Sequence, residues 1–328
     1  MMLSHLESLP LQVRDAFLIG TSARFPKQFH SQIKNIIYCG MGGSGISGDI
    51  LKVFFDRTST RSWTVLRDYR LPSWVDQSTL VVLSSYSGNT LEMKSIFQEA
   101  DRRGVPIMVQ TSGGWIAKAC RKKNYVQLEL PAGFPPRCAI GYLTFSLLAF
   151  FVNAGWIDIP HEDWDEIMDS VGKFPRKEAK ALAKKVCGKN IRFYGGGFLE
   201  PVALRWKTQF AENAKTLTGY GSVPEIFHHE VEGWHDPSVM IRHSVGVFFT
   251  DITEPKWLTK KRAVAINWMK KSGASAMLIS TKGKGLLAKI FYLIVLGDWT
   301  SYELALLNKE DPLSIKVIER IKASEKTA

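Results

Sequence analysis

The chain has 328 residues, of which 45% are hydrophobic and 23% charged. These values are typical of globular proteins and exclude a disordered chain, and the length allows two domains of ordinary size. The formal net charge is +12, but the longest basic runs, 121–123 and 260–262, have only three residues. No basic tail or stripe therefore predicts binding to nucleic acid, and a generally positive surface would steer an anionic small molecule toward its site.

The sequence indicates a soluble protein. Residues 1–10 have neither the basic nor the apolar region of a signal peptide, the apolar run 142–152 is too short to span a bilayer, and Lys289 interrupts the run 285–296. We expect a cytoplasmic protein with no membrane partner. The cysteines form no Cys-x-x-Cys pair, which predicts reduced core residues or incidental thiols: Cys39, Cys120, Cys138 and Cys187.

Strands and helices alternate along the first half of the chain. A leading helix is predicted over 6–19, and apolar strands are predicted near Asn35, Trp63, Leu80, Pro106 and Tyr125. This order is typical of a doubly wound parallel sheet, which binds ligands at the carboxyl ends of its strands.

A second α/β half is predicted after an acidic, Trp-containing segment with two prolines. Residues 190–195 echo 35–40, which suggests an internal duplication. We therefore expect an N-terminal domain over 1–153, a linker over 154–175 and a C-terminal domain over 176–328.

The first predicted strand, 35–39, runs into a glycine-rich turn that contains Gly43 and Ser44. Glycines let the backbone approach a ligand closely, and Ser44 adds a hydroxyl. The spacing is not the Gly-x-Gly-x-x-Gly of a dinucleotide site, and no Lys-Ser or Lys-Thr completes a P-loop.

The strand 80–83 ends in a second polar turn, followed by a predicted helix over 91–103. The turn contains Ser85, Ser87 and Thr90, and Thr90 is placed to cap the helix. Backbone N–H groups, the helix dipole and uncharged hydroxyls converge there, which predicts an anion site suited to a phosphate monoester. An ordinary strand-to-helix turn with good capping residues is the alternative.

Together the two turns resemble a known family. Residues 40–49 (Gly-Met-Gly-Gly-Ser-Gly-Ile-Ser-Gly-Asp) and 85–90 (Ser-Tyr-Ser-Gly-Asn-Thr) resemble the sugar isomerase (SIS) fold, and more narrowly the bifunctional phosphoglucose/phosphomannose isomerases of archaea and bacteria. The resemblance covers nearly the whole chain. It implies an α/β fold of two SIS-type domains, each a doubly wound parallel sheet in an α/β/α sandwich, with a C-terminal helix.

Two candidate catalytic residues follow from this resemblance. Arg137 is delivered by a proline-rich loop to the start of an apolar helix, where it invites an anionic partner or a surface ion pair. The family's Arg at this position stabilises an enediolate. Glu212 lies on a helix predicted over 204–216, where periodicity alone favours a solvated residue paired with Lys215. In the family, the Glu of a Glu-Asn-x-Lys sequence at this place is the base that moves the proton between C1 and C2, so the resemblance assigns that role to Glu212.

The segment 224–234 matches a family motif that contains a ring-opening histidine. His228 takes that place, while His229 stands where asparagine is usual, so either imidazole is a candidate. Structural histidines are one alternative. A metal bound by His228, His229, His235 and Glu230 is another, although the spacing fits no strong zinc signature.

The chain closes with a long apolar helix over 286–307, an Asp311-Pro312 pair and a last helix over 314–323. The resemblance places Lys322 near the sugar's ring oxygen. Leu313 and Ile315 depart from the small or polar residues expected after Asp-Pro.

The resemblance thus implies an isomerase that interconverts glucose 6-phosphate and mannose 6-phosphate with fructose 6-phosphate, without a metal or organic cofactor. It also implies a homodimer with its active site at the interface, where the partner chain donates the histidine. Retention of Glu212, His228 and Arg137 argues against a SIS-type sugar-phosphate sensor. An isomerase for another sugar phosphate remains a further alternative.

Overall fold

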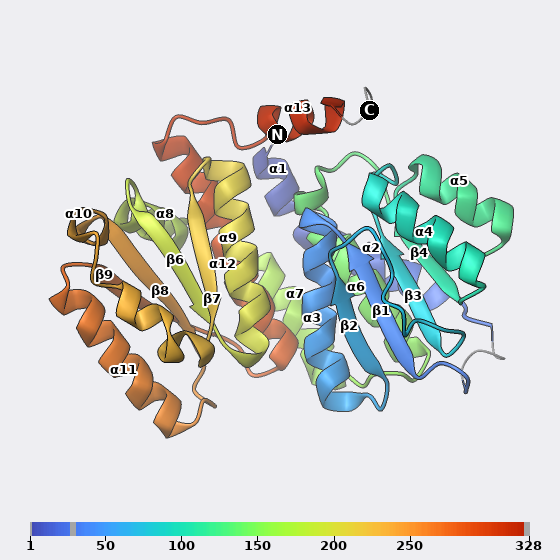
Figure 1. Cartoon of the computed structure of the whole chain (residues 1–328), viewed down its shortest axis with the longest axis horizontal. Helices are drawn as coiled ribbons and strands as arrows, with labels where there is room; N and C mark the ends of the chain where they lie inside the picture. Colours follow the sequence, from blue (N-terminus) through green and yellow to red (C-terminus); the bar gives the residue numbers. More distant parts are fainter. Residues whose placement is uncertain (1, 27–30, 325–328) are drawn as a thin grey trace. The chain divides into compact units, whose positions relative to one another are not determined.

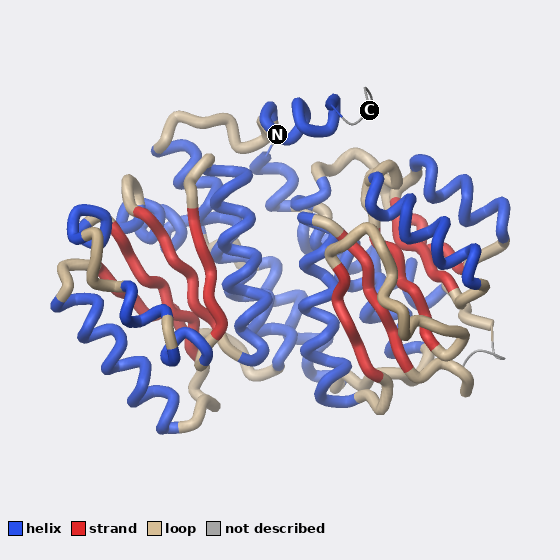
Figure 2. Tube along the Cα trace, viewed as in Figure 1, coloured by secondary structure: helices blue, strands red, loops and turns tan. Residues whose placement is uncertain are grey.

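The computed structural model describes residues 2–26 and 31–324, which form one compact unit over 3–172 and another from Lys173 onward (Figure 1). Each unit has its own parallel sheet with helices on both faces (Figure 2). The predicted α/β architecture with two doubly wound parallel sheets is confirmed.

Unit 1 contains a five-stranded sheet in the order β2-β1-β3-β4-β5. Its strands are β1 (Asn35–Gly40), β2 (Ser62–Leu66), β3 (Thr79–Ser84), β4 (Ile107–Thr111) and β5 (Val126–Glu129). Its helices are α1 (Met2–Glu7), α2 (Leu9–Ser22), α3 (Gly42–Thr58), α4 (Leu91–Arg103), α5 (Gly114–Lys123), the short 3-10 turn η2 (Pro136–Cys138), α6 (Ile140–Asn153) and α7 (His161–Gly172).

Alternation along β1 divides the core of unit 1. Ile37 and Cys39 face a cluster that includes Phe97 of α4 and Cys120 of α5. On the other face Tyr38 stacks on Trp63, and helices α3 and α6 pack together there. Side chains of a strand alternate in direction, so β1 contributes apolar residues to both faces of the sheet, and helices cover both faces.

Unit 2 has a four-stranded sheet in the order β7-β6-β8-β9, with strands β6 (Asn190–Gly195), β7 (Thr218–Ser222), β8 (Ser244–Thr250) and β9 (Ser275–Ser280). Its helical elements are α8 (Arg176–Val186), η3 (Gly197–Leu199), α9 (Glu200–Ala214), η4 (Glu225–His228), η5 (Glu230–Gly233), α10 (Ser238–Arg242), α11 (Lys256–Lys271), α12 (Leu286–Leu307) and α13 (Lys316–Ser324).

The two faces of the unit 2 sheet carry different elements. Phe193 packs against Phe210 of α9, with ring centroids 5.0 Å apart. The next residue, Tyr194, points to the opposite face and packs in a cluster with Ile226 of η4 and Met269 of α11. Helix α9 therefore lies on one face, and the η4–α11 layer lies on the other.

Several predicted boundaries change. The leading helix forms as α1 and α2, with Pro10 in the first turn of α2. Helix α3 begins inside the glycine-rich turn, at Gly42. The segment expected as a linker, 154–175, contains α7, which packs against α2 and belongs to unit 1.

Helix α12 is long and apolar enough to cross a membrane, but most of it is buried inside unit 2. It packs between α8 and α9, and the indole N–H of Trp206 donates to the Leu293 carbonyl at 2.9 Å. Its composition is therefore that of a core helix.

Candidate active site

The two polar turns of unit 1 lie side by side at the carboxyl edge of the sheet. Strands β1 and β3 are neighbours, but the chain leaves β1 toward α3 and β3 toward α4, on opposite faces. Ligands of doubly wound sheets bind at such a switch point. The two turns for which the sequence predicted an anion site therefore lie at the switch point of the sheet.

Ser44 joins the two turns. Its side chain is buried, and its Oγ accepts a hydrogen bond from the backbone N–H of Tyr86 at 3.1 Å. Ser44 thus holds the β3–α4 turn against the start of α3, a contact that the sequence did not indicate.

The β3–α4 turn has one buried and one exposed serine. Ser85 is buried, and its Oγ lies 3.0 Å from Oγ1 of Thr90, whereas Ser87 is exposed. Thr90 precedes α4 as predicted but does not cap it, because its hydroxyl is directed to Ser85 instead. The first-turn N–H groups of α4 are therefore not satisfied by this side chain.

Gly43 lies directly against the turn that contains Arg137. A Cβ at Gly43 would come within 2.6 Å of the Arg137 backbone nitrogen, closer than real Cβ atoms approach. Arg137 is 3% exposed and is therefore a buried residue rather than a surface one. The close approach therefore places the backbone of Arg137 beside the first turn of α3.

Tyr86 and Gln12 hold the loop around Arg137 and were missed by sequence reasoning. The Tyr86 hydroxyl donates to the Pro131 carbonyl at 2.6 Å and accepts from the Phe134 N–H at 3.2 Å. The Gln12 amide is buried; it donates to the Cys138 carbonyl at 2.9 Å and accepts from a backbone N–H of α6. Both are ordinary core residues by sequence, and only their long-range partners connect them to this loop.

His5 also belongs to this neighbourhood. Its ring centroid is 5.1 Å from that of Phe134. Burial, with a contribution from the charge of Arg137, lowers the pKa of His5. A neutral imidazole at neutral pH is the consequence.

In unit 2, Glu212 lies in the last turn of α9 and is partly buried. The neighbouring Asn213 is fully buried and donates to Ser301 Oγ of α12 at 2.9 Å. One turn apart on the same face, Gln209 and Arg205 both bind Asp298, with Arg205 in a buried ion pair at 2.6 Å. This polar ladder anchors the helix that carries Glu212.

Lys215 makes contacts that helix periodicity did not suggest. Its Nζ donates to the Glu212 carbonyl at 2.7 Å and to the Asp311 carbonyl at 2.9 Å. Lys215 thus ties the end of α9 to the Asp311-Pro312 segment that precedes α13. Lys322 lies in α13 and is exposed.

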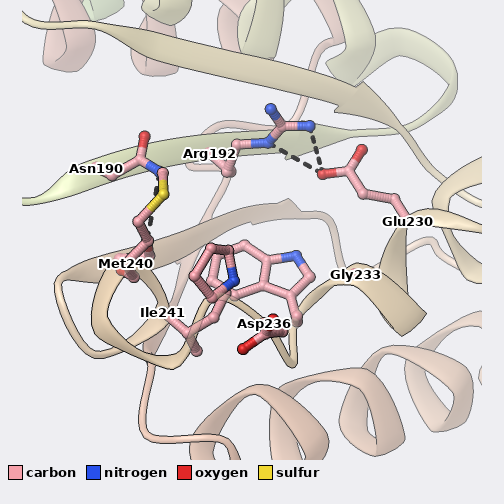
Figure 3. Close-up of a pocket in the computed structure, with 10 residues that line it drawn as sticks. Asn190, Arg192, Glu230, Gly233, Asp236, Met240 and Ile241 are labelled. Carbon is pink, nitrogen blue, oxygen red and sulfur yellow. Dashed lines mark hydrogen bonds and ion pairs between the residues drawn. The ribbon is translucent and has the colours of Figure 1, made fainter.

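His228 ends the short 3-10 turn η4 and is exposed, as is His229, whose Nε2 is 3.5 Å from Oε1 of Glu225. Glu230 anchors this segment to strand β6. Its carboxylate accepts from Arg192 at 2.6 Å and from the Tyr194 hydroxyl at 2.6 Å. Figure 3 shows the Arg192 guanidinium directed at Glu230, beside a cavity of about 220 Å³.

These contacts bear on the metal alternative. Glu230 is engaged by Arg192 and Tyr194, and the ring of His235 stacks against Trp268. Within residues 2–26 and 31–324, no group of three or more His, Cys, Asp and Glu is arranged to hold a metal ion.

Glu212 and His228 are separated by the unit 2 sheet. Helix α9 packs on the Phe193 face, whereas η4 lies on the Tyr194 face. Moreover, α9 ends just before β7 begins and η4 follows the end of β7, so Glu212 and His228 lie near opposite ends of this strand. The carboxylate and the imidazole of one chain are therefore not brought together within unit 2.

The switch point of unit 2, between β6 and β8, has a different chemistry. Asp251 follows β8 and forms an ion pair with Lys289 at 3.0 Å. Burial alone would raise the pKa of Asp251, but hydrogen bonds from Thr253, Thr281 and Lys289 lower it overall. A fixed carboxylate at this position repels a phosphate dianion, so this switch point differs from the polar, uncharged turns of unit 1.

Comparison with known proteins gives results for the whole chain and for its second half. The sequence model described as "Bacterial phospho-glucose isomerase C-terminal SIS domain" matches residues 176–324. A bifunctional phosphoglucose/phosphomannose isomerase of Caldicellulosiruptor bescii is 32% identical over 98% of this chain and 98% of its own length. A D-glucosamine-6-phosphate 4-epimerase of Sulfolobus acidocaldarius is 33% identical, but over only 61% of this chain and 63% of its own length.

Among solved structures, the C-terminal domain of a glucosamine-fructose-6-phosphate aminotransferase from Francisella tularensis has a TM-score of 0.73. It covers 95% of this chain and 96% of that domain at 13% identity, a likeness of fold alone.

Proposed function

Since the chain belongs to the bifunctional phosphoglucose/phosphomannose isomerase family, we propose that it interconverts glucose 6-phosphate and mannose 6-phosphate with fructose 6-phosphate. The observation that carries this proposal is the 32% identity to such an isomerase along 98% of both chains. The adjoining polar turns of unit 1 and the anchored Glu212 support it. The resemblance noted from the sequence leads to the same activity.

In this proposal the phosphate binds at the switch point of unit 1. Ser85, Ser87 and Thr90 supply hydroxyls, and the first turn of α4 supplies N–H groups and a positive dipole end. Gly43 and Ser44 form the adjoining wall at the start of α3. The absence of a Thr90 cap supports this role, because a cap would compete with an anion for the same N–H groups.

The chemistry needs three further steps. His228, assisted by Lys322, protonates the ring oxygen and opens the cyclic sugar. Glu212 removes the proton from C2 and returns it to C1, while the hydroxyl proton passes from the C2 oxygen to the C1 oxygen, so that the aldehyde becomes an alcohol and C2 becomes the ketone. Arg137 stabilises the negative charge of the cis-enediolate between these transfers. For mannose 6-phosphate, rotation about the C2–C3 bond lets the same base reach the opposite configuration.

We further propose that the active protein is a cytoplasmic homodimer and that His228 is supplied by the second copy. The separation of Glu212 from His228 by the unit 2 sheet supports this arrangement, because a proton-transfer base and a ring-opening acid must both reach one hexose. His228 is also exposed and thus accessible to another chain.

A coupled assay with EDTA present tests the activity. The purified protein is given glucose 6-phosphate and mannose 6-phosphate separately, and fructose 6-phosphate is detected. Turnover of both is expected. Turnover of glucose 6-phosphate alone would restrict the proposal, and turnover of neither sugar phosphate would contradict it.

The variant Glu212→Gln separates binding from catalysis. It keeps the shape of the side chain and one acceptor oxygen but cannot accept the C2 proton, so we expect a loss of turnover of about 100-fold or more. Calorimetry should show that fructose 6-phosphate still binds. Unchanged turnover would remove Glu212 from the base role, and sugar-phosphate binding without any turnover in the unmodified protein would favour the sensor alternative.

A further inference from the structure

We propose that Tyr38 is a positioning residue of the anion site in unit 1, and that it acts by holding Ser44 from the interior of the protein. This inference rests on the proposed function, because it assumes that a phosphate binds beside Ser44. Tyr38 lies in β1, on the face of the sheet that α3 and α6 cover.

Ser44 is held at two of its polar groups. Its backbone carbonyl accepts a hydrogen bond from the Tyr38 hydroxyl, and its Oγ accepts one from the Tyr86 N–H at 3.1 Å. A serine hydroxyl has one proton and two lone pairs, so the bond received from Tyr86 leaves the proton available for donation. The two contacts together fix the position of this hydroxyl and leave its proton for an anion.

Glycines of the first turn bring α3 this close to Tyr38. A Cβ at Gly48 would lie 2.2 Å from Cδ1 of the Tyr38 ring, and a Cβ at Gly45 would lie 2.8 Å from the Gly40 carbonyl oxygen. Real Cβ atoms do not approach so closely, so α3 can pack here only without side chains at these positions. Gly45 and Gly48 thus serve the packing of α3 on β1, which brings the Ser44 carbonyl to the Tyr38 hydroxyl.

The Tyr38 hydroxyl is a lasting donor at this position. Tyr38 is fully buried, and its ring stacks on Trp63 with centroids 5.7 Å apart. Burial raises the pKa of Tyr38 far above its usual value, so the hydroxyl keeps its proton at neutral pH and well above it. Because a buried hydroxyl without a partner is costly, the bond to Ser44 is the stable arrangement.

The second polar turn has its own support on the same face of the sheet. Ser84, the last residue of β3, is fully buried and donates to Gln110 Oε1 at 2.8 Å. The Gln110 amide in turn donates to Ser146 Oγ of α6 at 2.8 Å. The turn after β3 is therefore a fixed reference, and the bond from Tyr38 sets the position of Ser44 relative to it.

The experiment compares Tyr38→Phe with Tyr194→Phe. Both variants remove one fully buried hydroxyl and keep the ring, but the Tyr194 hydroxyl lies in unit 2, where it binds Glu230 and Trp234. Circular dichroism should show both variants folded. Isothermal calorimetry with inorganic phosphate measures the anion site without any turnover. Tyr38→Phe should raise the dissociation constant for phosphate about 5-fold or more, whereas Tyr194→Phe should change it less than about 2-fold.

A second series tests whether Tyr38 acts through Ser44. Ser44→Ala removes the hydroxyl but keeps the carbonyl that Tyr38 binds. Adding Tyr38→Phe to Ser44→Ala should weaken phosphate binding no further, because the hydroxyl that Tyr38 positions is already absent. A loss of stability alone would weaken binding equally with and without the Ser44 hydroxyl.

The isomerase assay adds a kinetic test. Phosphate is held alike in the ground state and in the transition state, so Tyr38→Phe should raise KM for glucose 6-phosphate about 5-fold and leave kcat unchanged. A fall in kcat with an unchanged KM would contradict a role in phosphate binding.

The outcomes separate this inference from the proposed function. Unchanged phosphate binding by Tyr38→Phe, an equal loss in Tyr194→Phe, or a further loss in the Ser44→Ala background would overturn the role of Tyr38, while the isomerase proposal stands. If the calorimetric results are as expected but neither sugar phosphate is turned over, the role of Tyr38 in anion binding stands and the proposed function fails. If the unmodified protein binds neither phosphate nor fructose 6-phosphate, both are wrong.

Discussion

The contact between Gly43 and the Arg137 turn makes Gly43→Ala a test of how the site is built. A methyl group at Gly43 would lie 2.6 Å from the Arg137 nitrogen and 2.8 Å from both Arg137 Cα and the Pro136 carbonyl carbon. Ordinary van der Waals contact begins at 3.4 Å, so the two backbones must separate by about 0.8 Å. All three atoms belong to the backbone, and no flexible side chain can move aside.

This displacement should affect activity more than folding. A misplacement of about 1 Å in a reacting group costs on the order of 100-fold in rate, whereas one extra methyl in a packed region costs about 1–3 kcal/mol of stability. We therefore expect kcat/KM to fall about 100-fold in the coupled assay. Urea unfolding should show a protein that is still folded.

Gly42→Ala is the matched control. Gly42 has φ +51, and a Cβ there would meet no atom within 4 Å. Alanine at this position costs roughly 1–2 kcal/mol through backbone strain, but it does not press on the Arg137 turn. If Gly43→Ala kept unmodified kcat/KM, or if both variants lost activity equally, the close approach of Gly43 would not be what positions Arg137.

Two further variants test the electrostatics of unit 2. Arg192→Met should lower the free energy of unfolding by about 1–3 kcal/mol in urea, because the partly buried Glu230 carboxylate loses its charged donor; no change would mean that solvent replaces the guanidinium. Asp251 has a pKa below its unfolded value of about 3.9, so the stability that it contributes is present above about pH 4 and is lost as pH falls. Asp251→Asn should therefore be less stable than the unmodified protein near neutral pH, with a difference that shrinks in acid. A constant difference in unfolding free energy between about pH 7 and pH 3 would contradict this assignment.

Helices and strands could be predicted wherever a few neighbouring residues carried the pattern. The bounds 91–103 and 286–307, expected from periodicity and flanking polar residues, are those of α4 and α12. Predictions changed where a local signal was ambiguous. The glycine-rich segment after β1 was expected to be a turn, but α3 already starts within it, at Gly42.

Residue types in the candidate site could be identified, but their partners could not. Thr90 has the composition and place of a helix cap, yet its hydroxyl is directed to Ser85. Glu212 and Lys215 have the spacing of a surface ion pair, but that spacing did not indicate that Lys215 donates to the backbone carbonyls of Glu212, Asn213 and Asp311. These outcomes depend on which groups of distant segments come close, and spacing along one helix carries no information about that.

By itself, the sequence determined the α/β class, the two-sheet plan, the switch-point turns and the family, because each depends on periodicity or on short motifs that are complete within a few residues. Only the tertiary structure decided that Gly43 supports Arg137, that Tyr86 and Gln12 hold its loop, and that the unit 2 sheet separates Glu212 from His228. The physical reason is that these relations depend on the alternating faces of a sheet and on contacts between segments far apart in the chain. Packing of the whole fold sets both.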